Sequence, residues 1–311
     1  MKRVSVITPT YRRAGNLPGL VAALEAQTLG RDAFDVIVAD DASPDDTARV
    51  LEELRSRTPL DLKVVRNRTN RGPGAARNLA LRQTDAPVIA FTDDDCLPTP
   101  GWLEAGLKCV EAGADIVQGQ TIPDPAVPYG RWAVSQSITA FDDRYETCNI
   151  FYRTATLRDA GGFDEDMPFF GEDTVLGWTA LRLGATTDFE PEALVHHAVI
   201  QPGAGYYWRW SQQHGNWATL LRRFPEMRSK VLWAGLFTKR RHAGIVAAAA
   251  GIAAGVAWRP ALALALPYLV YRLPRSLSRR AVEDQVLNAA FDAAVVIGLV
   301  RGSVRERTLV L

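Results

Sequence analysis

The fold is decided by one stretch, Val88-Ile89-Ala90-Phe91-Thr92-Asp93-Asp94-Asp95-Cys96, an apolar run that ends in three consecutive acids. The run is short and follows Pro87, which predicts a strand buried on both faces. Adjacent carboxylates repel one another, and a cation between them relieves that repulsion. Mg²⁺ and Mn²⁺ prefer oxygen ligands, and open α/β sheets bind ligands at the carboxyl ends of strands, so the acids predict a metal site. A solvated acidic turn is the alternative that this stretch alone leaves open.

Strand-like and helix-like stretches alternate around this run. Short apolar segments predict strands, and apolar residues at helical spacing predict the helices between them. Such alternation is typical of right-handed crossovers and of a doubly wound, mostly parallel sheet. The expected strands cover residues 4–7, 35–39, 62–65, 88–92, 116–119, 149–152 and 193–197.

Polar residues follow several of these strands at the point where each one ends. Asp40 and Asp41 follow the second strand, the acids of the opening stretch follow the fourth, and Gly72-Pro73-Gly74 with Arg77 comes after the third. The carboxyl ends of parallel strands share one edge, so these side chains should converge on one crevice. Glycines allow a ligand to approach the backbone, and an arginine suits a phosphate or a base edge. Ordinary turn chemistry explains a lone Gly-Pro-Gly, but it explains four sites at one edge poorly.

The composition excludes several classes of protein. The chain has 311 residues, 47% of them hydrophobic, and a formal net charge of +1, which gives no overall nucleic-acid signature. Cys96, Cys109 and Cys148 fit neither a zinc spacing nor a disulfide framework, so we expect a reducing compartment. A strand-like segment follows Met1-Lys2-Arg3 directly, and we expect no signal peptide.

Taken in order, the motifs of the first two thirds of the chain resemble those of the family-2 inverting glycosyltransferases, which have the GT-A fold. An acid triplet alone is weak support, whereas the ordered set is strong. The matching segments are residues 8–13 (TPTYRR), 38–43 (VADDAS), 72–78 (GPGAARN), 92–95 (TDDD), 161–164 (GGFD), 171–173 (GED) and 195–197 (VHH). The resemblance implies a GT-A catalytic domain over residues 1–225. The remaining residues, 226–311, are expected to form a helical, membrane-associated region because of their own apolar runs. One departure is Arg12-Arg13, where the family commonly has Asn-Arg.

The resemblance also implies which residues bind the nucleotide sugar. Tyr11 would stack on the base, and one of Asp40 and Asp41 would accept a hydrogen bond from it, which suits the N–H of uracil. The donor is therefore expected to be a UDP-sugar. The full set of implied nucleotide-sugar contacts is Pro9, Thr10, Tyr11, Asp40, Asp41, Gly74, Arg77, Asp93 and Asp94.

For the chemistry, the resemblance implies a metal and a base. Mg²⁺ or Mn²⁺ would be held by Asp93 and Asp95 of the DXD motif, with His197 nearby; His196 and a purely structural histidine remain alternatives. The metal would neutralise the leaving diphosphate, and inversion would follow from a single displacement. Asp173 would be the catalytic base, with Glu172 beside it. Because Asp173 is expected to open a helix, we expect the helix to lower its pKa; its alternative role is to stabilise that helix.

The chain after residue 225 is expected to associate with a membrane. Residues 243–258 and 261–271 are apolar, but neither run reaches the roughly 20 residues that a spanning helix needs. We expect a re-entrant hairpin or in-plane helices, with anionic lipid on the cytosolic side meeting Arg272, Arg275, Arg279 and Arg280. The aromatic segment 206–217 would face an acceptor or the membrane interface. The alternative is that these helices pack in the fold or between copies of the chain.

Together these observations predict a metal-dependent inverting glycosyltransferase at the cytosolic face of the cell membrane. It would transfer a sugar to a hydroxyl of a glycan or a lipid-linked acceptor, as in the synthesis of cell-envelope polysaccharides. A nucleotidyltransferase on a related sheet is one alternative, although residues 8–14 lack its glycine-rich loop. A non-catalytic carbohydrate-binding relative is another. The sequence does not identify the sugar, the acceptor or the linkage.

Overall fold

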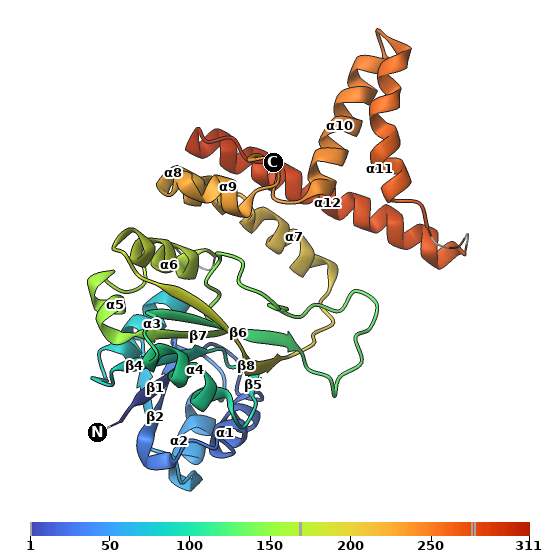
Figure 1. Cartoon of the computed structure of the whole chain (residues 1–311). Helices are drawn as coiled ribbons and strands as arrows, with labels where there is room; N and C mark the ends of the chain where they lie inside the picture. The colour runs from blue at the N-terminus through green and yellow to red at the C-terminus, as the bar shows by residue number, and fades with distance from the viewer. Residues whose placement is uncertain (1, 168–169, 275, 277) are drawn as a thin grey trace. The chain divides into compact units, whose positions relative to one another are not determined.

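The computed structural model describes residues 2–167, 170–274, 276 and 278–311, and these form two compact units (Figure 1). The units comprise Met1–Gln201 and Pro202–Leu311. The division falls earlier than the boundary at residue 225 that the sequence suggested. The reason is that two helices before residue 225, α7 (Ala204–Gln213) and α8 (Asn216–Arg223), pack against α12 (Arg279–Glu306). Both helices therefore belong to the second unit.

The first unit is built on one mixed eight-stranded sheet, in the order β3-β2-β1-β4-β7-β6-β8-β5. The pairs β1–β2, β1–β4, β2–β3 and β6–β8 are parallel, and β4–β7, β6–β7 and β5–β8 are antiparallel. The strands are β1 (Val4–Thr10), β2 (Phe34–Asp40), β3 (Leu62–Arg66), β4 (Val88–Thr92), β5 (Cys96–Pro98), β6 (Ile116–Pro123), β7 (Asn149–Arg153) and β8 (Thr187–His197). The doubly wound α/β expectation is confirmed, with the antiparallel β7 set between parallel strands.

Strands β1, β2 and β4 are buried on both faces, and the predicted acids stand at the ends of β2 and β4. Every residue of β1, β2 and β4 is buried, so these strands read as continuous apolar runs. In the β1–β2 register Thr10 lies beside Asp40, and in the β1–β4 register Ile7 lies beside Phe91. The residues that follow these strands therefore emerge at one edge of the sheet.

Helices cover the sheet and close its core. They are α1 (Leu17–Glu25), α2 (Thr47–Arg57), α3 (Pro73–Leu81), α4 (Trp102–Glu111), α5 (Thr154–Asp159) and α6 (Glu172–Arg182). Helix α3 packs on β1, β2 and β3, whereas α4 packs on β6, β7 and β8. Trp102 of α4 is fully buried, and its indole N–H donates to Asn149 at 2.8 Å. That bond satisfies the one polar atom of a large apolar side chain and joins α4 to β7.

A short strand that the sequence analysis did not predict fixes the geometry after the three acids. The chain turns at Asp95 and runs antiparallel to the end of β8, with Cys96 opposite His197 and Leu97 opposite His196. Three residues are too few for a pattern to indicate a strand. Strand β8 also begins at Thr187, six residues before the expected start, because its first half pairs with β6.

The second unit is helical. Besides α7, α8 and α12 it contains a 3₁₀ turn η2 (Pro225–Met227), α9 (Arg228–Val231), α10 (Arg240–Gly255), a 3₁₀ segment η3 (Arg259–Ala265) and α11 (Leu266–Tyr271). Backbones approach closely where α12 carries Gly298 and Gly302, which lie against Ser211 and Gly215; a Cβ atom at either glycine would collide with backbone. Helix α12 is the one helix, among the residues described, that is long and apolar enough to cross a membrane by length and composition alone.

One of the arginines expected to meet lipid turns inward instead. Arg272 forms an ion pair with Asp292, a residue of α12 that is 1% exposed, and its guanidinium also lies over the ring of Tyr271. The buried carboxylate of Asp292 attracts the guanidinium of Arg272. Because Asp292 lies in a different helix, the sequence around Arg272 does not reveal this partner. Arg279 and Arg280 are exposed, while Arg275 lies outside the described residues.

Candidate active site

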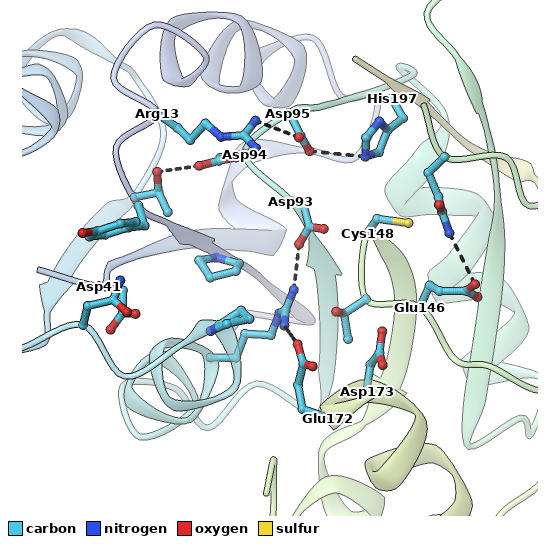
Figure 2. Close-up of a pocket in the computed structure, with 18 residues that line it drawn as sticks. Arg13, Asp41, Asp93, Asp94, Asp95, Glu146, Cys148, Glu172, Asp173 and His197 are labelled. Carbon is cyan, nitrogen blue, oxygen red and sulfur yellow. Dashed lines mark hydrogen bonds and ion pairs between the residues drawn. The ribbon is translucent and has the colours of Figure 1, made fainter. Parts of the chain in front are cut away.

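A cavity of about 430 Å³ opens at the carboxyl ends of the parallel strands (Figure 2). Most of its wall consists of residues that the sequence singled out. The predicted residues that line it are Pro9, Thr10, Tyr11, Asp41, Arg77, Asp93, Asp94, Asp95, Glu172, Asp173 and His197. Asp40 and Gly74 are absent from the lining.

Arg77 connects two acids across the floor of this cavity. It is 3% exposed, and its guanidinium lies 2.7 Å from Asp93 Oδ1 and 3.2 Å from Glu172 Oε1. The guanidinium also lies over the ring of Phe163, 5.5 Å from its centroid. A buried arginine paired on two sides holds helix α3, the end of β4 and the start of α6 in one arrangement.

Gly74 contributes to this arrangement by its small size. A Cβ atom at Gly74 would lie 3.3 Å from Phe163 and 3.4 Å from Glu172, so any side chain would press on the residues around Arg77. The first turn of α3 can therefore lie close to α6. The structure places Gly74 behind the cavity wall, and its contact with Glu172 is the role that the geometry supports.

Asp95 and His197 meet on the other side of the cavity. His197 Nε2 lies 3.4 Å from Asp95 Oδ1, and Arg13 Nη1 donates to Asp95 Oδ2 at 2.9 Å (Figure 2). His197 Nδ1 lies 3.0 Å from the carbonyl oxygen of Ala198. A carbonyl only accepts, so Nδ1 is the donor in this contact and Nε2 is the ring nitrogen that faces the carboxylate. His196 points to the other face of β8 and does not line the cavity.

Asp94 is the most enclosed of the three acids. Its Oδ2 accepts a hydrogen bond of 2.6 Å from the Thr10 hydroxyl, and the residue is 8% exposed. Burial raises the pKa of Asp94 to about 7, since it outweighs the opposing effects of the Thr10 bond and of Arg13. Asp94 therefore carries a proton through much of the acidic range, which reduces the repulsion within the triplet.

Asp40 and Asp41 have different surroundings. Asp40 accepts from the backbone N–H of Ser43 at 2.9 Å and pairs with Arg66 at 2.9 Å. Asp41 lines the cavity and accepts from the Asn67 side chain and from the backbone N–H groups of residues 71 and 72. The N–H of residue 71 is shared between both carboxylate oxygens, so one acceptor position of Asp41 can be released to a ligand.

Asp173 lies in the first turn of α6, as expected, but its pKa moves in the opposite direction from the one predicted. Burial, followed by the charge of Glu172, raises the pKa of Asp173 to about 7. Backbone N–H groups of Thr174 and Thr147 favour the ionised form, and so does Arg77, but they do not offset burial. Burial also raises the pKa of Glu172, against the effect of Arg77.

Glu146 is a residue of the cavity that the sequence analysis missed. Its Oε1 accepts from Gln136 at 3.3 Å, whereas its Oε2 is buried and has no hydrogen-bond partner among the residues described. Burial, with the charge of Asp142 next, raises the pKa of Glu146 to about 8. The remaining lining residues that were not predicted are Arg13, Asn70, Pro73, Gln136, Thr147 and Cys148. Residues 124–148 have no periodicity that could have drawn attention to them.

The side chains beside Asp95 fit a hard divalent cation. Carboxylate and imidazole groups suit Mn²⁺, and Mg²⁺ accepts the oxygens. The Asp95 carboxylate oxygen and the His197 Nε2 atom face each other as two ligands of one cation would, and the Nδ1 contact with Ala198 is the kind of outer contact that orients a histidine ligand. Cys96 Sγ also lies near, but burial raises the pKa of this thiol and keeps it protonated. Asp95 and His197 lie together as candidate ligands of the ion, whereas Asp93, the other predicted ligand, is paired with Arg77.

Comparison with known sequences places this chain in a family. A model of the glycosyl transferase family 2 matches residues 5–166, slightly more than half of the chain. The glycosyltransferase AglE of Haloferax volcanii is 30% identical over 185 residues, which cover 57% of this chain and 60% of AglE. The pre-mycofactocin glycosyltransferase of Mycobacterium tuberculosis is 30% identical over 215 residues, which cover 62% of this chain and 42% of that protein. The chain thus spans about half the length of these curated relatives.

Solved structures support the same fold. The mannosyltransferase PcManGT from Pyrobaculum calidifontis, in complex with GDP-Man and Mn²⁺, superposes with a TM-score of 0.70 at 22% identity, covering 96% of this chain and 87% of that one. Residues 1–349 of TarS from S. aureus, in complex with UDP, superpose with a TM-score of 0.53 at 21% identity, covering 99% and 92%. At these identities the comparison establishes the GT-A fold.

Proposed function

The chain belongs to the glycosyl transferase family 2, and from that premise we propose that it transfers a sugar from a nucleotide diphosphate sugar to a hydroxyl group. One observation carries the proposal: Asp93, Asp95, Arg77 and Asp173, which come from three separate segments, line one cavity at the carboxyl edge of the sheet. Nucleotides and other ligands bind at this edge in open α/β sheets. The cavity volume of about 430 Å³ suits a ligand of that size.

In this proposal a divalent metal accompanies the donor. Asp93, Asp95 and His197 would hold Mg²⁺ or Mn²⁺, and Arg13 and Arg77 would keep the carboxylates in place. The ion, when bound, supplies positive charge that stabilises the leaving diphosphate. PcManGT, a structural neighbour, was solved with Mn²⁺, which supports the choice of ion.

Asp173 acts as the base in the proposed reaction. It takes the proton from the acceptor hydroxyl while the acceptor oxygen bonds to the anomeric carbon and the bond to the diphosphate breaks on the opposite face. This single displacement inverts the anomeric centre. A carboxylate with a pKa of about 7 is a better base near neutral pH than an ordinary one. Glu172 supports it by raising that pKa and by anchoring Arg77.

The donor in this proposal is a UDP-sugar. Tyr11 is 40% exposed at the mouth of the cavity, where its ring can stack on a base, with Pro9 and Thr10 beside it. Asp41 can accept the uracil N–H in place of one of its two contacts with the N–H of residue 71. The unpartnered Glu146 Oε2 can form a hydrogen bond with a hydroxyl of the sugar, since a buried polar atom without a partner is costly.

The acceptor is proposed to be a glycan or a lipid-linked molecule at the cytosolic face of the membrane. The second unit supports this, because its α10–α11 hairpin exposes large apolar side chains such as Val256 and Trp258. Such residues are typical of segments that lie in a membrane interface. Synthesis of cell-envelope polysaccharide is the process that these features suit.

A donor panel tests this function. Release of nucleotide is measured with UDP-, GDP- and TDP-sugars, with and without Mn²⁺, and Asp173→Asn serves as the matched control. We expect nucleotide to be released from a UDP-sugar. This release should require Mn²⁺ and should be lost in Asp173→Asn. If no nucleotide sugar is turned over and none binds, the chain does not have this activity.

A further inference from the structure

A second cavity, of about 360 Å³, lies within the helical unit and is separate from the site described above. It is lined by the first turn of α10 and by the end of α11. All of its charged lining residues are cations. The lining consists of Lys239, Arg240, Arg241, Gly244, Pro267, Tyr268 and Tyr271. Figure 1 shows α10 and α11 side by side as the two arms of a hairpin.

Two arginines at this cavity share one carboxylate. Asp292 pairs with both Arg241, at 2.8 Å, and Arg272. Tyr268 also donates its hydroxyl to Asp292, at 2.9 Å. One carboxylate therefore balances one of the two arginines and orients both. Arg240 adds a further positive charge at the rim and is exposed.

The backbone adds to this positive potential. Lys239 is the N-cap residue of α10, and the helix begins at Arg240 and runs for 16 residues. The first N–H groups of a long helix carry partial positive charge and favour an anion, above all a phosphate group. Guanidinium and ammonium groups beside such a helix end are the usual partners of a phosphate. The chemistry of this cavity is thus that of an anion site.

What surrounds the cavity indicates where the anion comes from. The hairpin that forms the cavity exposes a run of large apolar side chains, and a site for a free anion in water has no need of them. Trp258 lies between the two arms and is 65% exposed, and Val256 is 91% exposed. The other exposed apolar residues of the hairpin are Ile252, Leu262, Leu264, Leu266, Leu269, Val270 and Leu273.

We propose that the cavity between Arg240 and Tyr271 binds the phosphate group of an anionic membrane lipid while the hairpin lies among the lipid chains. The proposal rests on the membrane attachment proposed above and gives it a defined binding site. Arg240 and Lys239 contact the phosphate oxygens. Asp292 does not contact the lipid; it is a positioning residue that holds Arg241 and Arg272 at the cavity.

The test compares two exposed arginines of the helical unit in the full-length chain. Arg240 lines the cavity, whereas Arg280, on α12, is exposed and does not. Vesicles of phosphatidylcholine, with and without phosphatidylglycerol, are used to measure binding by co-sedimentation. Loss of one cation near an anionic surface weakens binding about fivefold, and this is the expected effect of Arg280→Gln. Arg240→Gln removes charge-assisted hydrogen bonds as well, and we expect a loss of roughly fiftyfold.

Equal losses for Arg240→Gln and Arg280→Gln would contradict the proposal, because diffuse attraction would then explain the binding. Titration with inorganic phosphate is the second arm. We expect no saturation at millimolar phosphate, and tight phosphate binding without vesicle binding would instead indicate a soluble anion and overturn the lipid assignment. Thermal melting confirms that both variants are folded. Binding of UDP to the first unit reports on the proposed transferase separately, and we expect neither variant to change it.

Discussion

Asp95 Oδ1 and His197 Nε2 face each other at 3.4 Å, because the short strand β5 turns the chain after the three acids and pairs it with the end of β8. Because Cys96 and His197 are partners in the β5–β8 register, His197 reaches the cavity and its neighbour His196 does not. A carboxylate oxygen and an imidazole nitrogen in this arrangement are close enough to bind one metal ion together.

The first prediction concerns the metal. Asp95→Ala and His197→Ala should each lower transfer by roughly a hundredfold or more, because the ion contributes several kcal/mol of charge stabilisation. His196→Ala is the matched control and should leave transfer unchanged. Transfer is measured with and without Mn²⁺, and the melting temperature of each variant shows whether it is folded. Full activity in excess chelator would exclude a metal role.

The second prediction concerns the pH dependence of transfer. Asp173 must be ionised to take a proton, and its pKa is raised to about 7. The value of kcat/KM should therefore rise with pH and level off above about 7, instead of near the pKa of an ordinary carboxyl group. Glu172→Gln removes the negative charge that contributes to the shift, so the midpoint should move to lower pH. A rate that is independent of pH between 5 and 8 would contradict this assignment.

The sequence predicted the parts of the site that follow regular elements. Asp41 and Asp94 could be placed because apolar runs mark β2 and β4 and both strands end at the same edge. Glu146 could not, because it lies in an irregular loop and reaches the cavity only through tertiary contacts such as Gln136. The pKa of Asp173 was predicted in the wrong direction because a helix end is visible in sequence, whereas burial beside Glu172 is not.

The third prediction concerns stability. The pKa values of Asp94 and Asp173 in the folded chain, about 7, lie above the usual value of 3.8, so the folded state binds more protons than the unfolded state between pH 4 and 7. Stability must then fall as pH rises through this window, by at most about 1.4 kcal/mol per pH unit for each group. Asp94→Asn should make the dependence shallower. Chemical denaturation of the metal-free protein at several pH values measures the free energy of unfolding. If this free energy falls more steeply with pH in Asp94→Asn than in the wild type, the argument is refuted.

The fourth prediction concerns the nucleotide base. Competition among UDP, GDP and TDP should favour UDP over GDP, because Asp41 can accept the ring N–H of uracil, which thymine shares. Asp41→Ala should weaken UDP binding and also loosen the loop that ends at Gly72, whose N–H it accepts at 2.8 Å. Asp40→Asn is the control, since Asp40 does not line the cavity. A preference for GDP would show that Asp41 serves only the loop.

The central claim is that this cavity performs sugar transfer with Asp173 as the base, and Asp173→Asn tests it most directly. Asparagine keeps the shape of the side chain but cannot take a proton. The measurement is kcat for nucleotide release with donor and acceptor at saturation, together with the Kd for UDP. We predict that kcat falls by roughly a hundredfold or more, the usual scale for loss of a general base, while the Kd for UDP hardly changes. Near-normal turnover in Asp173→Asn would contradict the account.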